Sequence, residues 1–217
     1  MSMISKLRTL FTFGRGVVVG LGDLDGHRDP IDLFNDWFGA AKRAGIMLPE
    51  AMAVATASPD GAPSARMMLC KGVEDGHFVF FTNYESRKSN ELLHNPRAAL
   101  VFHWAILQRQ VRVEGSVTKL SPEKSDEYFQ SRPRGSRIGA WASKQSTPLD
   151  NRTELDARVR EYEERFANQP VPLPPHWGGY ELAPTCIEFW QGKANRLHDR
   201  LQFRRLGEGW TTTRLYP

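Results

Sequence analysis

The chain has 217 residues, 40% of them hydrophobic and 25% charged, which is enough to bury the core of one domain or of two small ones. Its formal net charge of +4 suits the binding of small anions such as phosphates and does not by itself indicate a nucleic-acid partner. No stretch approaches the ~20 consecutive apolar residues of a membrane span, so we expect a protein that does not cross a membrane.

Residues 1–28 predict a mobile N-terminal arm. They carry glycines without a sustained apolar period, and Arg15 interrupts the one run that resembles a targeting signal. The two cysteines, Cys70 and Cys186, each lie in an apolar run, which favours buried thiols in a reducing compartment over a disulfide. We therefore expect a cytoplasmic protein whose residues 29–217 form a single domain.

The first expected elements are a helix followed by strands. "DPIDLFNDWFGAAKRAG" has Asp29 as N-cap, Pro30 in the first turn and Gly45 at the exit of an apolar stripe, which predicts a packing helix. From Ala51 to Asn83 three apolar runs are separated by "PDG" and "EDG", a pattern typical of an antiparallel meander. Residues 98–120 predict two more strands.

The second half predicts both helices and strands. Ser121 and Asn151 suit the N-cap positions of helices over 121–132 and 151–167, and the cation-rich stretch 128–146 is interpreted as a loop. Strands are expected at 185–192, 200–206 and 210–216. The sum is a mainly β fold, an antiparallel Greek-key-like barrel with peripheral helices.

Common nucleotide and metal motifs are missing from the sequence. It contains no G-x-G-x-x-G after a strand, no P-loop, no H-E-x-x-H, no G-x-S-x-G and no metal-ligand spacing. A Rossmann-type nucleotide site and a metal site are therefore not expected. Any phosphate must be held by another arrangement.

One such arrangement is "NYESRKSNELLHNP". Ser86 is a plausible N-cap of a short helix, which puts Arg87 and Lys88 in its first turn, where the helix dipole disfavours cations. An anion bound at that terminus would reverse the penalty, so we interpret the turn as a phosphate site. The alternative is that both cations are simply exposed to solvent.

Other cations are concentrated in three places. The stretch 128–146 holds Arg132, Arg134, Arg137 and Lys144 without an acidic residue, which favours anion recognition; an RNA-binding loop would look similar, but stacking aromatics are sparse. In "SARMMLCK", Arg66 and Lys71 lie on opposite faces of a regular strand unless one is beyond the strand end. In "NRLHDR", an extended chain would put Arg196, His198 and Arg200 on one face, either over a ligand or at a solvated edge.

Seven segments together resemble the pyridoxine/pyridoxamine 5′-phosphate oxidase family, in the same order and spacing. They are "RMMLCK", "FFTNYESRKSNELLHNPRAAL", "QRQVRVEG", "YFQSRPRGSRIGAWASKQS", "PPHWGGYEL", "IEFWQG" and "NRLHDRLQF". The resemblance runs from about Asp29 to Pro217. It implies an FMN-binding split barrel and a homodimer with FMN at the subunit interface.

The resemblance also implies a reaction. Pyridoxine 5′-phosphate or pyridoxamine 5′-phosphate would be oxidised to pyridoxal 5′-phosphate by hydride transfer from C4′ to the flavin. Dioxygen would accept the electrons and give hydrogen peroxide, and the amine substrate would also release ammonia.

Site residues follow from the same resemblance, position by position. Arg196 and His198 would lie beside the reacting carbon as catalytic residues. Substrate contacts fall at Lys71, Tyr128, Arg132, Ser136, Arg196, Leu197 and His198. FMN contacts fall at Arg66, Met67, Met68, Leu69, Cys70, Lys71, Phe81, Thr82, Arg87, Lys88, Gln110, Gln145, Ser146, Trp190 and Arg200.

The sequence departs from the family pattern near its start. Relatives often carry an N-terminal Arg-x-x-Tyr that closes over the substrate, whereas this chain has Arg8 with Phe11. Two other functions were weighed: a related FMN oxidase of the phenazine-pathway type, and a non-catalytic module that binds flavin or nucleic acid. The expected phosphate contacts at Lys71, Tyr128, Arg132 and Ser136 favour the pyridoxine phosphate substrate over the phenazine-type alternative.

Overall fold

The structure is a computed structural model that describes residues 28–217. The predicted mobile arm, with Arg8 and Phe11, lies outside the described residues except for Arg28.

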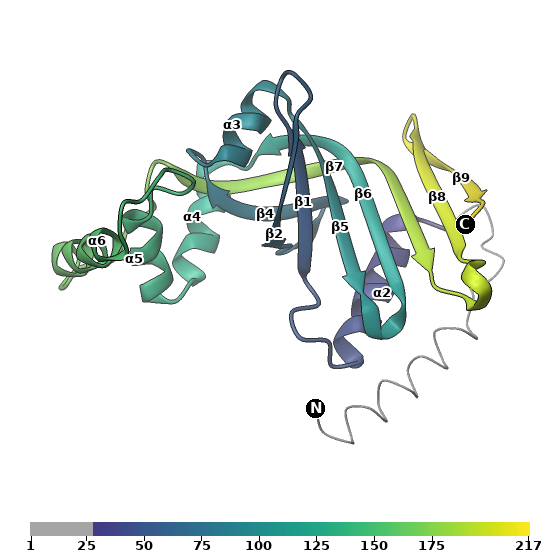
Figure 1. Cartoon of the computed structure of the whole chain (residues 1–217), viewed down its shortest axis with the longest axis horizontal. Helices are drawn as coiled ribbons and strands as arrows, with labels where there is room; N and C mark the ends of the chain where they lie inside the picture. The colour runs from purple at the N-terminus through teal and green to yellow at the C-terminus, as the bar shows by residue number, and fades with distance from the viewer. Residues whose placement is uncertain (1–27) are drawn as a thin grey trace.

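In the part of the chain that the structure describes, nine strands form one antiparallel sheet, as the alternating apolar patterns predict. They are β1 (Ala51–Ala57), β2 (Pro63–Leu69), β3 (Gly72–Glu74), β4 (His77–Asn83), β5 (Arg97–Trp104), β6 (Arg109–Lys119), β7 (Trp177–Gln191), β8 (Asp199–Leu206) and β9 (Gly209–Leu215). The order β2-β1-β5-β6-β7-β4-β3 does not close on itself, and β8 and β9 extend it from β7. The expected barrel is therefore open (Figure 1).

Strand β7 organises the sheet because it pairs with three neighbours along its length. It pairs with β4 at its start, with β6 over most of its length and with β8 at its end. The sequence prediction began this strand only at residue 185, because "WGGY" resembles a turn. Gly178 and Gly179 lie within the strand and allow side chains to pack directly against its backbone. A Cβ on Gly178 would overlap the Tyr84 ring, and one on Gly179 would overlap Leu120.

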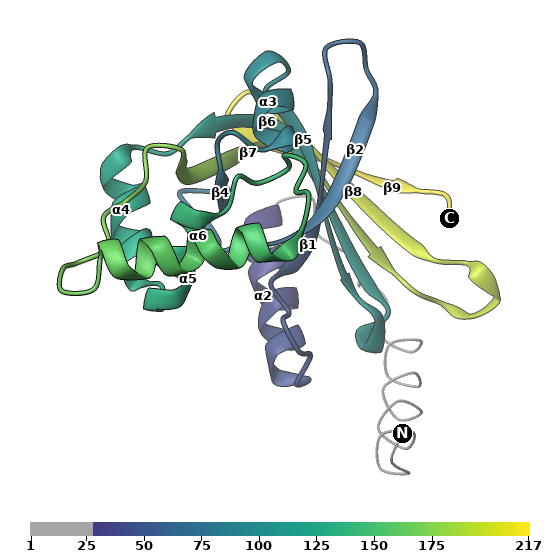
Figure 2. The same ribbon diagram turned by 60° about the vertical axis from the view of Figure 1, so that its left-hand side comes forward.

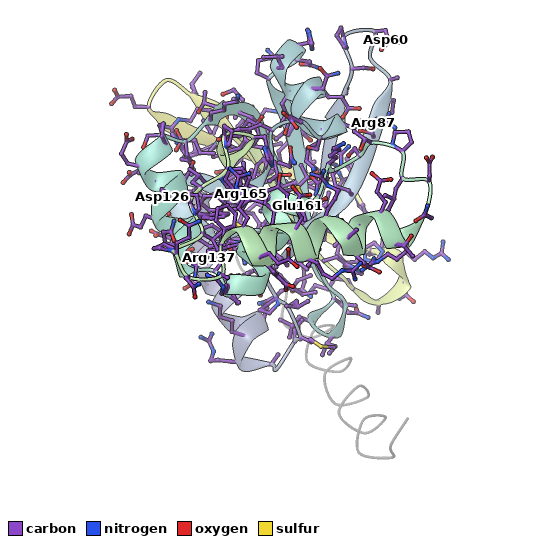
Figure 3. The ribbon with its side chains drawn as sticks, turned by 90° about the vertical axis from the view of Figure 1, so that its left-hand side faces the viewer. Asp60, Arg87, Asp126, Arg137, Glu161 and Arg165 are labelled. Carbon is purple, nitrogen blue, oxygen red and sulfur yellow. The ribbon has the colours of Figure 1, made fainter. Side chains whose placement is uncertain are left out.

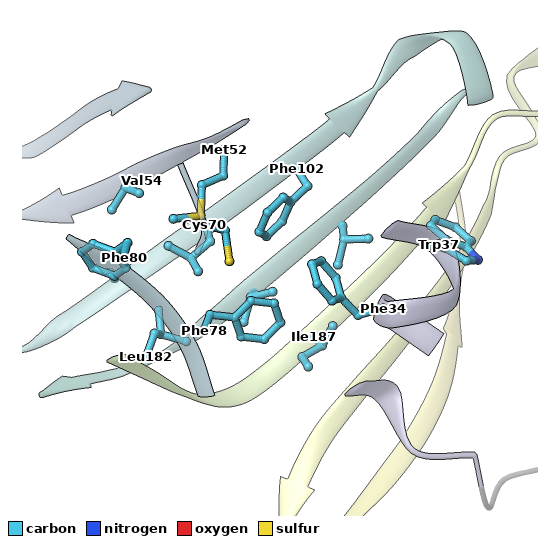
Figure 4. Close-up of a cluster of buried hydrophobic side chains, with 14 of the residues drawn as sticks. Phe34, Trp37, Met52, Val54, Cys70, Phe78, Phe80, Phe102, Leu182 and Ile187 are labelled. Carbon is cyan, nitrogen blue, oxygen red and sulfur yellow. The ribbon is translucent and has the colours of Figure 1, made fainter. Parts of the chain in front are cut away.

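Helix α2 (Pro30–Arg43) closes one side of the main core, as predicted. Asp29 caps it by accepting a hydrogen bond from the Ile31 amide, and the stripe through Phe34 and Trp37 is buried. The Phe34 ring lies edge-on to Phe78 at 4.9 Å between centroids (Figure 4). Each such buried side chain contributes roughly 1.5–3 kcal/mol to folding, so the packing of this helix stabilises the main core.

Four further helices of the described residues lie between strands in the sequence. Helix α3 (Arg87–His94) connects β4 to β5, and α4 (Pro122–Ser131), α5 (Arg134–Ala142) and α6 (Arg152–Arg165) lie between β6 and β7. Helices α4 to α6 gather at one end of the sheet, whereas β8 and β9 lie at the other end (Figures 1 and 2). The predicted caps are present: Ser121 and Asn151 accept hydrogen bonds from the amides of Lys124 and Glu154. A second core cluster joins these helices around Phe129, Phe166 and Trp177.

The loop interpretation of 128–146 is wrong for its central part. Helix α5 occupies 134–142, and Ile138 and Ala142 on one of its faces are buried. Gly135 and Gly139 lower the helix propensity of this segment, so its residue types do not predict the helix. Packing against α4 and α6 supplies the stability that propensity lacks.

Both cysteines are free and buried, as expected. Among residues 28–217, no helix has the length and apolar character needed to cross a membrane.

Candidate active site

A cavity of about 630 Å³ lies between strands β2 and β4 and helices α3, α4 and α5. Twelve predicted site residues line it: Arg66, Met67, Met68, Leu69, Lys71, Phe81, Thr82, Lys88, Tyr128, Arg132, Ser136 and Gln145. The lining also includes residues to which the sequence assigned no role: Asn83, Pro133, Gly139, Ala140, Ser143 and Trp177. The volume is in the range of small-ligand sites.

The cavity wall is strongly positive. Arg66, Lys71, Lys88 and Arg132 all contribute to the lining, and none of the lining residues within 28–217 is Asp or Glu. Glu91, behind the lining, lies 3.4 Å from Arg66 and offsets part of this charge, and bound anions would further reduce the repulsion among the cations. The cavity is therefore suited to ligands with several negative charges.

Lys71 reaches this wall because it lies beyond the end of β2. The strand ends at Leu69, so Lys71 is free of the alternation that would put it opposite Arg66. Its Nζ lies 5.7 Å from the centroid of the Tyr128 ring. The second of the two alternatives raised by the sequence is therefore correct.

Lys88 is buried in the first turn of α3. Its Nζ donates to Thr82 Oγ1 at 2.9 Å, to Ser86 Oγ at 2.9 Å and to Gln145 Oε1 at 2.8 Å. Burial, together with the charge of Arg66, lowers the pKa of Lys88 to about 8. An anion beside it would raise that pKa again.

Ser86 has the N-cap position predicted for it at the start of α3, but its side chain does not cap the helix. Its hydroxyl is buried, donates to the Asn83 carbonyl at 2.8 Å and receives the Lys88 ammonium. The hydrogen bond from the charged Lys88, two residues further along the chain, takes the place of the side-chain cap.

Arg132 carries an unpaired donor. Its Nη1 is buried and has no hydrogen-bond partner among the described residues, and its guanidinium lies 4.6 Å from the Trp177 ring centroid. Phe81 stacks on Tyr128 at 3.9 Å between centroids, which builds an aromatic wall beside it. A buried unpaired N–H costs about 1–3 kcal/mol, so an acceptor from a ligand would stabilise this arrangement.

The other cations of the 128–146 stretch do not line this cavity. Arg134 donates to the backbone carbonyls of Phe166 and Gln169, and Arg137 donates to Gln130. Lys144 lines a separate hollow. Of the cations in this stretch, only Arg132 keeps the anion-binding interpretation, with Ser136 four residues further on in the first turn of α5.

Three residues predicted to contact FMN lie beside the cavity rather than in its lining. Arg87 and Ser146 line a neighbouring hollow of about 480 Å³, and Figure 3 shows Arg87 well apart from Arg137. Cys70 points into the main core, where burial raises the pKa of its thiol to about 11. Its thiol is thus kept protonated and unreactive.

The remaining predicted residues lie at the far end of β7. Gln110, Trp190 and Arg200 are register partners on β6, β7 and β8, and the His198 ring lies 4.5 Å from that of Trp190. The lining of the main cavity includes none of them. Trp177 lines the cavity and Trp190 lies thirteen positions further along the same strand, so up to about 43 Å of extended chain separates them.

The extended alternation predicted for "NRLHDR" is wrong. Residues 194–196 form a single 3₁₀ turn, Asn195 and Arg196 have φ values of 58° and 60°, and β8 begins only at Asp199. Leu197 is 67% exposed. A left-handed pair at this point cannot be read from side-chain alternation, because Arg is not typical of that conformation.

A carboxylate that the sequence analysis missed compensates Arg200. Glu188 is 5% exposed and accepts from Arg200 Nε at 2.9 Å and from Arg200 Nη2 at 3.2 Å. The β7–β8 register brings the two together, so no spacing within either segment signals the pair. A second missed carboxylate, Glu91, pairs with Arg87 at the helical spacing of four residues, which the sequence does contain.

Residues 38–166 match the family described as pyridoxamine 5′-phosphate oxidase, and residues 177–217 match the pyridoxine 5′-phosphate oxidase C-terminal dimerisation region. The pyridoxine/pyridoxamine 5′-phosphate oxidase of Psychromonas ingrahamii is 54% identical over the full length of both chains. That of Rubrobacter xylanophilus is 56% identical over 91% of each chain.

Solved structures give the same fold. PhzG from Burkholderia lata 383, in complex with tetrahydrophenazine-1-carboxylic acid, is 32% identical with a TM-score of 0.86, over 93% of this chain and all of that chain. A pyridoxamine 5′-phosphate oxidase-related, FMN-binding protein from Nostoc punctiforme is 16% identical with a TM-score of 0.71, over 88% and 99% of the two chains. These matches confirm the fold class predicted from the sequence.

Proposed function

The chain belongs to the pyridoxamine 5′-phosphate oxidase family, and from this premise we propose how its described residues carry out the reaction. It is an FMN-dependent oxidase that converts pyridoxine 5′-phosphate or pyridoxamine 5′-phosphate to pyridoxal 5′-phosphate, in the biosynthesis and salvage of that cofactor. It is a homodimer, as the match to the dimerisation region supports. We propose that residues 29–217 act as one oxidase domain. Its cytoplasmic location stays a prediction.

The positive cavity fits FMN and a phosphorylated substrate together. Each ligand carries a phosphate, and the wall supplies four cations with no carboxylate among them. The buried unpaired Nη1 of Arg132 is the observation that carries the proposal, because it lacks the acceptor that a substrate phosphate would supply. Lys88, whose pKa is lowered by burial, supports an FMN phosphate at the turn before α3.

We assign the roles as follows. The chemistry that bound FMN supplies is a two-electron oxidation at C4′ of the substrate, with dioxygen as the final acceptor. Lys71, Arg132 and Ser136 hold the substrate phosphate, with Tyr128 beside them. The segment Met67 to Lys71, with Phe81, Thr82 and Gln145, lies along the flavin, and Arg66, Arg87 and Lys88 surround its phosphate.

The site requires both subunits. Gln110, Trp190, Arg196, His198 and Arg200 lie at the end of β7 remote from the cavity, so within one chain they do not reach a ligand bound there. A twofold partner brings its copy of that end over the cavity, which puts FMN at the subunit interface. Arg196 and His198 of the second subunit then orient C4′, and Arg200 with Gln110 and Trp190 completes the flavin site.

A second candidate function is oxidation of a reduced phenazine ring, supported by the similarity to PhzG at 32% identity. The relatives at 54% and 56% identity favour the pyridoxine phosphate substrate instead. The Arg132 donor also favours it, because it matches a phosphate.

The deciding experiment compares three substrates with the FMN-reconstituted protein. Pyridoxine 5′-phosphate should give pyridoxal 5′-phosphate and one equivalent of hydrogen peroxide. Pyridoxine without its phosphate should have a kcat/KM lower by about two orders of magnitude or more, the effect of losing charge-assisted phosphate contacts. Equal turnover of the two, or turnover only of a reduced phenazine carboxylate, would contradict the proposal.

A further inference from the structure

Glu91 of α3 is a buried carboxylate with partners from three elements. It is 4% exposed. Its Oε1 accepts from Arg87 Nε at 2.9 Å, and its Oε2 accepts from Ser64 Oγ at 2.6 Å and from Thr56 Oγ1. Arg66 Nη2 lies 3.4 Å from the same Oε2. Strands β1 and β2 and helix α3 therefore meet on one carboxylate.

The two hydroxyls connect Arg66 to this carboxylate. Arg66 Nη1 donates to Thr56 Oγ1 at 2.6 Å, and Arg66 Nη2 donates to Ser64 Oγ at 2.5 Å. Each hydroxyl thus accepts a hydrogen bond from Arg66 and donates one to Glu91. The guanidinium is held in one orientation on the cavity wall, because both of its terminal nitrogens are engaged.

The other carboxylate oxygen of Glu91, Oε1, binds Arg87 in a different way. Glu91 engages only its Nε, and the two terminal nitrogens have no hydrogen-bond partner among the described residues. The Arg87 side chain is 64% exposed, so this free fork is open to a ligand. A planar pair of N–H donors matches two oxygens of a phosphate.

We propose that Glu91 is a positioning residue for FMN, which holds Arg66 through two hydroxyls and aligns the free fork of Arg87 for the flavin phosphate. The inference rests on the proposed function, in which these arginines surround that phosphate. Although burial acts against the charged form, the hydrogen bonds from Ser64, Thr56 and Arg87 and the charge of Arg66 hold the pKa of Glu91 at about 2. The carboxylate is therefore ionised throughout the neutral pH range.

The sign of one mutational effect separates positioning from simple charge balance. The charged groups facing one another here are Arg66, Arg87, Lys88 and Glu91. If Glu91 only offset the cations, its removal would strengthen phosphate binding, because a negative charge near the phosphate would be lost. If it positions the arginines, its removal must weaken phosphate binding despite that gain.

The experiment titrates apoprotein with FMN and, separately, with riboflavin, which lacks the phosphate. Glu91→Gln is expected to raise the Kd for FMN about tenfold or more. Both carboxylate oxygens of Glu91 accept hydrogen bonds, and the NH₂ group of Gln would put N–H donors against one set of these donors. The Kd for riboflavin should change less than about twofold, because the rest of the flavin site is untouched. Glu91→Asp keeps the charge and should restore part of the FMN affinity.

Glu85→Gln is the matched control. Glu85 is exposed and lines the same hollow as Arg87, so this change removes a nearby charge without touching the network. FMN affinity should be unchanged or slightly higher in this variant. Should Glu91→Gln fail to fold, Thr56→Val and Ser64→Ala test the hydroxyl links one at a time, each with an expected severalfold loss of FMN affinity and none of riboflavin affinity.

The outcomes distinguish this inference from the function on which it rests. Wild-type apoprotein that does not bind FMN would overturn both. Wild-type protein that binds FMN and oxidises pyridoxine 5′-phosphate, beside a folded Glu91→Gln variant with equal or tighter FMN binding, would overturn the positioning role alone. Equal losses of FMN and riboflavin affinity would also overturn it, because the effect would then be structural.

Discussion

Two impaired variants should restore each other's activity when their subunits are mixed, because the two halves of the proposed site lie at opposite ends of one chain. Arg132→Ala damages the cavity half, and Arg196→Leu damages the half beyond β7. Trp177 lines the cavity, whereas Trp190, thirteen positions further along β7, and Arg196 are not in its lining, so in the proposed site no single subunit brings the halves together. Each site of the dimer then takes one half from each subunit.

The magnitude follows from counting sites. Arg132→Ala alone should lower kcat/KM by about 10- to 150-fold, the scale of one charge-assisted contact. Arg196→Leu alone should lower it about 100- to 1000-fold. Random exchange of equal amounts makes half of the dimers mixed, and each mixed dimer has one site with both changes and one with neither, so about a quarter of all sites regain wild-type activity.

The assay measures peroxide formation at low pyridoxine 5′-phosphate after subunit exchange between differently tagged, FMN-loaded variants. Mixed dimers are isolated through both tags, and half of their sites should be fully active. A control mixes two preparations of Arg132→Ala, in which no site escapes the change. Activity of isolated mixed dimers that stays at the mean of the two parents would refute the shared site.

Three further predictions concern single residues. Arg132→Ala should mainly raise KM and leave FMN bound, because its contact serves ground and transition states alike; steady-state kinetics identical to wild type would remove Arg132 from the site. FMN affinity of the apoprotein should fall as pH rises from 7 to 9, by up to about tenfold per pH unit above 8. The reason is that Lys88, with its pKa near 8, must be protonated to attract the FMN phosphate. Titrations at three pH values measure this slope, which Lys88→Met should lack; a flat wild-type profile counts against the assignment. Arg200→Leu should weaken FMN binding and also leave Glu188 buried without its main partner, so thermal unfolding should shift downward even in the apoprotein, and full flavin affinity in that variant would exclude its flavin role.

Elements whose signals are local were predictable from sequence. Asp29 and Asn151 cap their helices as expected, because a cap and the amide that it binds are two or three residues apart. Val111 and Val113 alternate with polar neighbours and are fully buried, as a period of two requires. The helix at 134–142 was not predicted, because its glycines weaken the local signal and its stability comes from packing on α4 and α6.

The sequence by itself determined that this protein is an antiparallel β fold with clusters of cations, and its motifs, in their order and spacing, indicated the family. The tertiary structure alone decided which cations share a cavity. Lys71 joins Arg66 because β2 ends early. Arg132 joins them because α4 packs beside β4 and β7, where Tyr128 stacks on Phe81 and the Ser125 hydroxyl accepts from the Gly179 amide. It also decided that Arg200 finds Glu188 across a strand register and that the predicted site residues divide between two ends of β7. The physical reason is that burial and pairing depend on which strands become neighbours, and local spacing carries no information about that choice.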